Sequence, residues 1–75
     1  MEKKSELAIK FGAEVRRVRQ EQGWSQEGFA DACGIHRTYI GNVERGEKVV
    51  SIDMAKRVVD KLGLSLARFF EQLGE

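Results

Sequence analysis

The chain has 75 residues, 13 of them Lys or Arg and 12 Asp or Glu, and its formal net charge is +1 at pH 7. This length predicts one domain, residues 1–75, around one small core, and no apolar stretch approaches the ~20 residues that a membrane-spanning helix needs. The single cysteine, Cys33, excludes an internal disulfide and favours a cytoplasmic location, and with the single histidine, His36, it cannot complete a four-ligand zinc site.

Helices are predicted throughout the chain, because it contains no proline and no alternating apolar pattern of strand length. The expected fold class is all-α, a compact five-helix bundle. The expected helices are about 5–22, 26–33, 37–45, 52–62 and 66–73. Glycine readily adopts the left-handed conformation that ends a helix. The glycines at the expected helix ends are Gly23, Gly34, Gly46, Gly63 and Gly74.

The first residues, MEKKSE, lack the apolar core of a signal peptide. The first helix is expected to begin at about Ser5. Its apolar residues Leu7, Phe11, Val15 and Val18 recur at helical spacing and are expected to share one buried stripe. Three later helices are each preceded by a hydrophobic staple, in which apolar residues on either side of the N-cap pack together. The pairs are Trp24 with Phe29, Ile35 with Ile40, and Leu64 with Phe69.

The segment from about 25 to 46 predicts two short helices joined by a tight turn at Gly34. This shape allows the second helix to enter the major groove of DNA. Ile40 and Val43 are expected to face the core. Thr38 and Asn42 lie roughly opposite, and Arg37 flanks that outer face. Arg can donate two hydrogen bonds to guanine, Asn can pair with adenine, and Thr can meet a thymine methyl group. These three residues are therefore candidates for reading bases.

Several residues around the 37–45 helix are candidates for contact with the DNA backbone. Gln26 lies at the first position of the preceding helix, where its amide can reach a phosphate. Lys48 and the N–H groups near Ser51 could hold the backbone on the far side of the groove. Gly41 and Arg45 are expected on the outer face, and a close approach of DNA would explain a glycine inside a helix.

Glu44 is expected to turn toward the core, where a carboxylate needs a partner. The candidate partner is Arg19 of the first helix, in a structural ion pair that orients the second helix of the motif. His36 is expected to cap that helix.

The last helix, about 65–74, presents Leu66, Phe69, Phe70 and Leu73, more apolar surface than one small core needs. We expect these residues to form a dimer interface with a second copy of the chain. The two DNA-reading helices of a homodimer would then lie ~34 Å apart and face successive major grooves.

The residues Gly23–Glu27, Phe29-Ala30, Gly34-Ile35, Tyr39-Ile40 and Glu44–Gly46 together resemble the helix-turn-helix domain of the lambda-repressor and Cro class, the Xre family. The resemblance covers about Ile9–Phe70. The stretch HRTYIGNVERG, in a chain with no ligand-binding domain, is most similar to the controller proteins of restriction–modification systems.

The resemblance implies a homodimeric regulator of transcription that binds near-palindromic double-stranded DNA without a cofactor or a small-molecule ligand. By position, Arg37, Thr38 and Asn42 would read bases, and Gln26, Tyr39 and Arg45 would contact phosphates. A controller of this kind is expected to activate or to repress. Bound upstream it would recruit RNA polymerase, and bound over the promoter it would block it.

Two alternatives share the fold, namely a stand-alone regulator of another operon and an antitoxin-like module that binds a protein partner. The polar side chains of the 37–45 helix favour DNA, because a protein-binding face would show more apolar anchors. An enzyme is not expected, since the sequence shows no nucleophile–base pair, metal cluster or phosphate loop.

Overall fold

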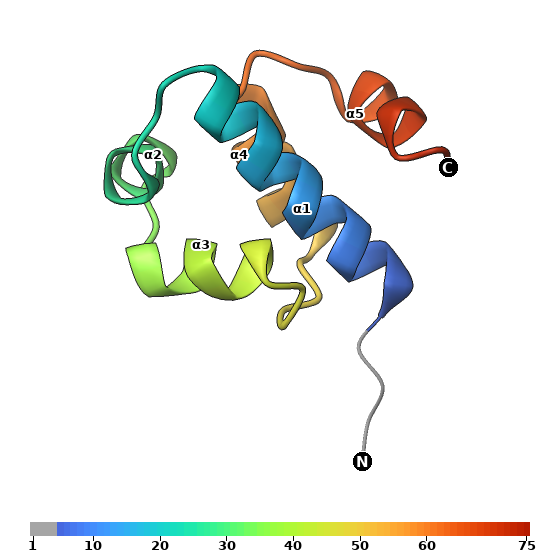
Figure 1. The fold of residues 1–75 in the computed structure, drawn as a ribbon, viewed down its shortest axis with the longest axis horizontal. Helices are drawn as coiled ribbons and strands as arrows, with labels where there is room; N and C mark the ends of the chain where they lie inside the picture. The colour runs from blue at the N-terminus through green and yellow to red at the C-terminus, as the bar shows by residue number, and fades with distance from the viewer. Residues whose placement is uncertain (1–4) are drawn as a thin grey trace.

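The computed structural model describes residues 5–75, and these form five helices and no strand (Figure 1). The helices are α1 (Glu6–Glu21), α2 (Gln26–Cys33), α3 (Arg37–Glu44), α4 (Ile52–Lys61) and α5 (Leu66–Gln72). The predicted all-α, five-helix fold is confirmed, and each predicted end lies within one residue of the observed one. Residues 1–4 of the predicted domain lie outside the described residues.

Local signals account for where the helices begin and end. Each helix starts at a side chain that accepts a hydrogen bond from a backbone N–H two or three residues later, which satisfies one otherwise unpaired donor of the first turn. These capping residues are Ser5, Ser25, His36, Ser51 and Ser65. The five glycines predicted at helix ends all have positive φ, between 73° and 82°.

The helix α1 runs through the middle of the molecule, with α3 on one side and α5 on the other (Figure 1). Its buried residues include Phe11, Val15 and Val18, as the apolar spacing predicts. The expectation for Leu7 is wrong, because its side chain is 45% exposed and Ala8 is buried instead. At the start of the helix the buried stripe therefore runs through Ala8, one position later in the chain than Leu7.

The helices α1 and α3 pack against each other at very short range. Gly12 of α1 faces the backbone of α3, and a Cβ atom placed on Gly12 would lie 1.9 Å from the carbonyl oxygen of Val43. No residue with a side chain can occupy this position without moving one of the helices. Gly12 therefore sets the distance between α1 and α3.

The remaining helices complete the core. The side chains of Phe29 from α2 and Phe69 from α5 are fully buried, and α4 contributes Ala55, Val58 and Val59. The ring of Phe69 meets that of Phe11 edge-on, with 5.3 Å between centroids. One hydrophobic cluster thus holds all five helices together.

Candidate nucleic-acid interface

The turn between α2 and α3 sets the position of α3. Gly34 ends α2 in the left-handed conformation, with φ 74° and ψ 30°. His36 then caps α3, since its Nδ1 atom accepts a hydrogen bond from the backbone N–H of Thr38 at 3.0 Å. The prediction that His36 is a capping residue is confirmed. Within three residues the chain therefore reverses from one helix into the next.

The inner side of α3 is buried. Ile40 and Val43 are at most 1% exposed, as predicted. Beside them Glu44 forms a two-bonded ion pair with α1, in which Arg19 Nε donates to Oε2 at 2.6 Å and Nη2 donates to Oε1 at 3.0 Å. The predicted pair between Arg19 and Glu44 is thus present, with side chains that are 8% and 3% exposed.

The ion pair belongs to a larger network that joins three helices. Arg19 Nη1 donates to the backbone carbonyl of Trp24, just before α2, at 2.9 Å. Gln26 Nε2 donates to Glu44 Oε1 at 3.1 Å. The amide of Gln26 is therefore engaged with α3, a contact that the sequence did not indicate. Among the described residues no buried side-chain nitrogen or oxygen lacks a partner, so the network is complete.

The outer side of α3 carries the residues predicted to read bases. Arg37 and Thr38 are exposed and Asn42 is partly exposed. Arg37 Nη1 donates to Glu27 Oε2 of α2 at 3.2 Å, and both side chains stay more than 60% exposed. Arg37 is thus tethered at one nitrogen, and its guanidinium still reaches solvent.

Arg45 lies at the end of the same outer side. Its Nη2 atom donates to Asn42 Oδ1 at 2.6 Å and its Nε atom donates to Glu47 Oε1 at 3.1 Å. Gly41 is buried rather than exposed, and a Cβ atom there would lie 3.2 Å from Arg45 Nη1 and 3.8 Å from the amide of Gln26. The side chains of Arg45 and Gln26 therefore already lie over Gly41, which is not on the open outer face that the sequence predicted.

The other predicted backbone contacts lie around the end of α3. Tyr39 is partly buried, and Lys48 Nζ lies 5.8 Å from the centre of its ring, a cation–π contact. The hydroxyl of Ser51 accepts a hydrogen bond from Met54 N at 3.1 Å and so caps α4. Tyr39 and Lys48 thus lie together, whereas the Ser51 side chain serves its own helix.

The four residues predicted to form a dimer interface differ in how far they are buried within one copy of the chain. Phe69 is 0% exposed within one protomer, so its side chain cannot contact a second copy, and this part of the prediction is wrong. Leu66, Phe70 and Leu73 are partly buried against the core. Sequence periodicity could not show that α5 turns Phe69 fully inward, because that depends on the angle at which α5 meets α1.

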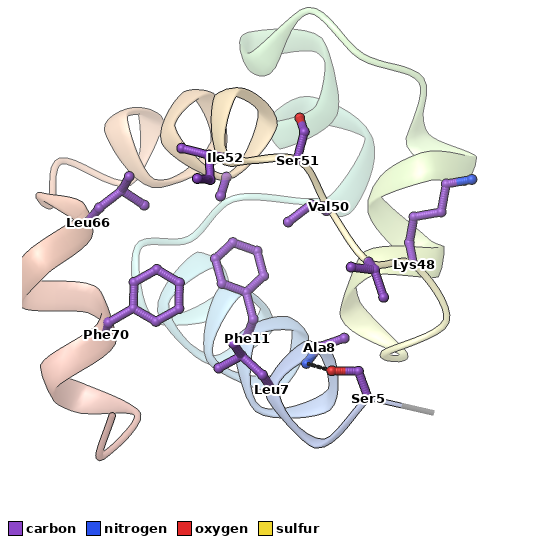
Figure 2. Close-up of a pocket in the computed structure, with 12 residues that line it drawn as sticks. Ser5, Leu7, Ala8, Phe11, Lys48, Val50, Ser51, Ile52, Leu66 and Phe70 are labelled. Carbon is purple, nitrogen blue, oxygen red and sulfur yellow. Dashed lines mark hydrogen bonds between the residues drawn. The ribbon is translucent and has the colours of Figure 1, made fainter. Parts of the chain in front are cut away.

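An apolar groove lies between α1, α4 and α5 (Figure 2). Leu66 and Phe70 line it from α5, and Leu7 lines it from α1. Two more side chains are strongly exposed here, Val49 at 78% in the segment before α4 and Ile52 at 79% as the first residue of α4. The sequence analysis missed this groove, although two branched apolar residues beside an N-cap serine are a signal for an exposed apolar surface.

Residues 5–75 contain no group of three or more His, Cys, Asp or Glu side chains that could hold a metal ion. Within the same range, none of the helices has both the length and the apolar character of a membrane span.

Comparison with known proteins places this arrangement among helix-turn-helix proteins. The sequence pattern of the helix-turn-helix family matches residues 15–69. The control protein C.BamHI of Bacillus amyloliquefaciens is 39% identical over 59 residues, which cover 77% of this chain and 73% of the relative.

Solved structures show the same fold. The restriction-modification controller protein C.Esp1396I, solved as a tetramer in complex with its natural 35 base-pair operator, has a TM-score of 0.84 and 32% identity. The match covers 92% of this chain and 91% of that one. The clp gene regulator ClgR of C. glutamicum has a TM-score of 0.88 and 27% identity, over 99% of this chain and 95% of that one.

Proposed function

This chain belongs to the helix-turn-helix family, and on that premise we propose that it is a homodimeric, sequence-specific DNA-binding regulator of transcription. We further propose that it controls the expression of a restriction–modification system, as an activator, a repressor or both. It acts on near-palindromic duplex DNA in the cytoplasm, and as an activator it contacts RNA polymerase.

The observation that carries this proposal is the asymmetry of α3. Its inner side is held by buried contacts to α1, while Arg37, Thr38 and Asn42 present polar groups on the outer side. These side-chain types match the hydrogen-bonding pattern of base edges in the major groove. An enzyme site or a protein-binding groove would require different chemistry on this surface.

The narrower proposal is supported by the named relatives. C.BamHI is a control protein, and C.Esp1396I is a restriction-modification controller solved with its operator. The clp gene regulator shares the fold at lower identity. Regulation of a different operon is therefore the alternative that the fold also permits.

Within this proposal the residues have distinct roles. Arg37, Thr38 and Asn42 read base edges, and Tyr39, Arg45 and Lys48 contact phosphates. Gln26 has its amide nitrogen on Glu44, so we propose that it supports α3 and contacts a phosphate only in addition. Ser51 offers a backbone N–H to a phosphate while its hydroxyl caps α4.

We propose that the dimer forms through the apolar groove, where Leu66 and Phe70 of α5 are joined by Leu7, Val49 and Ile52, and that Leu73, the C-cap of α5, adds to this surface. The exposed knobs at Val49 and Ile52 lie beside a groove of matching apolar character, so a two-fold axis can place each knob in the other copy's groove. Exposed apolar side chains that cluster in this way mark interaction surfaces.

The DNA proposal is tested by measuring, at increasing salt concentration, the affinity of the protein for duplexes that it selects from a random-sequence library. Log affinity should fall steeply with log salt, because phosphate contacts release counterions. Arg37→Ala should relax preference at one base pair by ~1–3 kcal/mol. The control is Arg57→Ala, which removes an exposed arginine of α4 and should preserve base preference. An affinity that does not respond to salt would contradict the proposal.

Ile52→Asp tests the dimer face, because it places a charge on an exposed apolar knob. Sedimentation should show a shift from dimer to monomer with helix content retained, and DNA affinity should fall with it. Ala13→Asp adds the same charge at an exposed site of α1 outside the groove. Equal dimerisation of both variants would place the interface elsewhere.

A further inference from the structure

A carboxylate lies beside the arginine that we assign to base reading. Glu27 Oε2 accepts from Arg37 Nη1 across the turn between α2 and α3, at 3.2 Å. The two side chains are 68% and 64% exposed, so water screens the pair and it adds little to stability. A negative charge on a surface that meets phosphates opposes binding. Its presence there requires a reason other than stability or affinity.

The surroundings of this pair increase the negative charge. Glu27 and Arg37 line an open hollow at the turn, together with Asp31 and His36. Asp31 follows Glu27 by one helical turn on α2, so both carboxylates lie on the same side of that helix. The hollow is therefore lined by two acids and a single guanidinium, and a phosphate entering it would meet both negative charges.

We propose that Glu27 is a specificity-determining residue, which favours contact of Arg37 with a guanine edge over contact with a phosphate. This inference rests on the proposed function. It concerns an acid on α2 that would act through Arg37 and would not read a base itself.

The geometry supports this discrimination. The ion pair uses Nη1 of Arg37, whereas the bidentate contact with guanine O6 and N7 needs only two of the five guanidinium donors. Arg37 can therefore read guanine and keep its bond to Glu27. A guanine edge carries no net charge, but a phosphate against the same guanidinium brings a second negative charge close to Glu27. Only the phosphate contact is penalised.

The expected consequence is a larger ratio of specific to non-specific affinity. Non-specific binding depends almost entirely on phosphate contacts, so Glu27 weakens it more than it weakens operator binding. The formal net charge of only +1 agrees with a protein that does not rely on general attraction to DNA.

The test compares Glu27→Gln with the wild type on two duplexes. One is selected by the wild-type protein from a random-sequence library, and the other is a shuffled duplex of the same composition. The variant should bind the shuffled duplex about threefold to fivefold more tightly and the selected duplex less than twofold more tightly. Glu27→Gln should also lower the preference for guanine at the same base pair where Arg37→Ala relaxes it.

Two further variants separate selectivity from a general effect of charge. Glu27→Asp keeps the negative charge and should restore low affinity for the shuffled duplex. Glu21→Gln removes a carboxylate of similar exposure, 64%, which pairs with Arg17 on α1. It should leave the ratio of affinities unchanged. Thermal unfolding of each variant checks that the fold is kept.

The outcomes separate the proposed role of Glu27 from the proposed DNA-binding function. A Glu27→Gln protein with the wild-type ratio, or with the same ratio as Glu21→Gln, overturns the role of Glu27 and leaves the DNA-binding function intact. A wild-type protein that selects no sequence from the library overturns the proposed function, and this inference with it.

Discussion

The two sides of α3 use the same kind of interaction under opposite conditions. On the inner side, Arg19 and Glu44 form a two-bonded ion pair with side chains that are 8% and 3% exposed. On the outer side, Arg37 and Glu27 share a single contact at 64% and 68% exposure. Burial turns the first pair into a structural requirement, because neither charge can be left without its partner. Solvent screens the second pair, so it adds little to stability and leaves the guanidinium of Arg37 accessible to a ligand.

The difference explains how one short helix can be fixed in place and still adapt to a ligand. Contacts that set the position of α3 come from α1 and α2 and are complete within the protein. The side chains that would read bases, Arg37, Thr38 and Asn42, contribute little to those contacts. Their replacement should therefore change recognition without changing the fold, and the predictions below test that separation.

The largest effect is expected from Glu44→Gln, which leaves the charge of Arg19 buried without a counterion. The free energy of unfolding should fall by about 3–5 kcal/mol, measured by urea denaturation. The double variant Arg19→Met with Glu44→Leu should lose less than the single one, because it removes both charges. A loss below about 1 kcal/mol for Glu44→Gln would show that the inner side does not depend on the pair.

Gly12→Ala should be the next most damaging change on the inner side. The added Cβ would lie 1.9 Å from the carbonyl oxygen of Val43, so α1 and α3 must separate. Overpacking of this kind costs about 1–3 kcal/mol. The control Arg16→Ala changes an exposed residue of the same helix and should stay within about 0.5 kcal/mol of the wild type. A stabilised Gly12→Ala protein would contradict the close approach.

Asn42→Ala tests the outer side. Stability should change by no more than about 0.5 kcal/mol, since the lost bond to Arg45 is exposed. Discrimination at one base pair should fall by about 1–3 kcal/mol, as measured by competition between duplexes. If the variant unfolded more easily but bound DNA with unchanged affinity and preference, Asn42 would help to hold α3 in place and would not read a base.

The smallest effect is expected from Glu14→Gln, which removes a partly buried carboxylate that pairs with Arg17 on the same helix, α1. A hydrogen bond from Arg17 lowers the pKa of Glu14, against the opposing effect of burial. The folded state therefore binds a proton less readily than the unfolded state. The pair's stabilisation is complete above the unfolded pKa and is lost as the pH falls through the folded pKa. Unfolding at several pH values should show a small loss near neutral pH that disappears as the acid range is entered. A loss that persists at low pH would exclude this cause.

The sequence predicted the helices accurately because their signals are local. Capping side chains precede each helix, glycines with positive φ follow each one, and no proline interrupts them. The Arg19–Glu44 pair was also predictable, since a carboxylate on the apolar side of a helix requires a partner and α1 offers an arginine at its flank. Capping by His36 followed from its position before α3.

Residues that depend on how two helices meet were not predictable in this way. The full burial of Phe69 and the exposure of Leu7 follow from how the helices meet. Gly41 is covered by the folded-back side chain of Arg45 and by Gln26 of α2. Glycine at position 12, within the buried stripe of α1, was a readable signal of close packing, but the sequence does not say against what.

By itself, then, the amino-acid order determined which segments are helical, where they stop and which chemical groups α3 carries, because these properties depend on neighbours within a few positions. Only the tertiary structure decided which acid lies beside Arg37, how Gln26 is used and where apolar side chains remain uncovered. Those features arise between segments that are distant in the chain, and their distances and angles are set by packing.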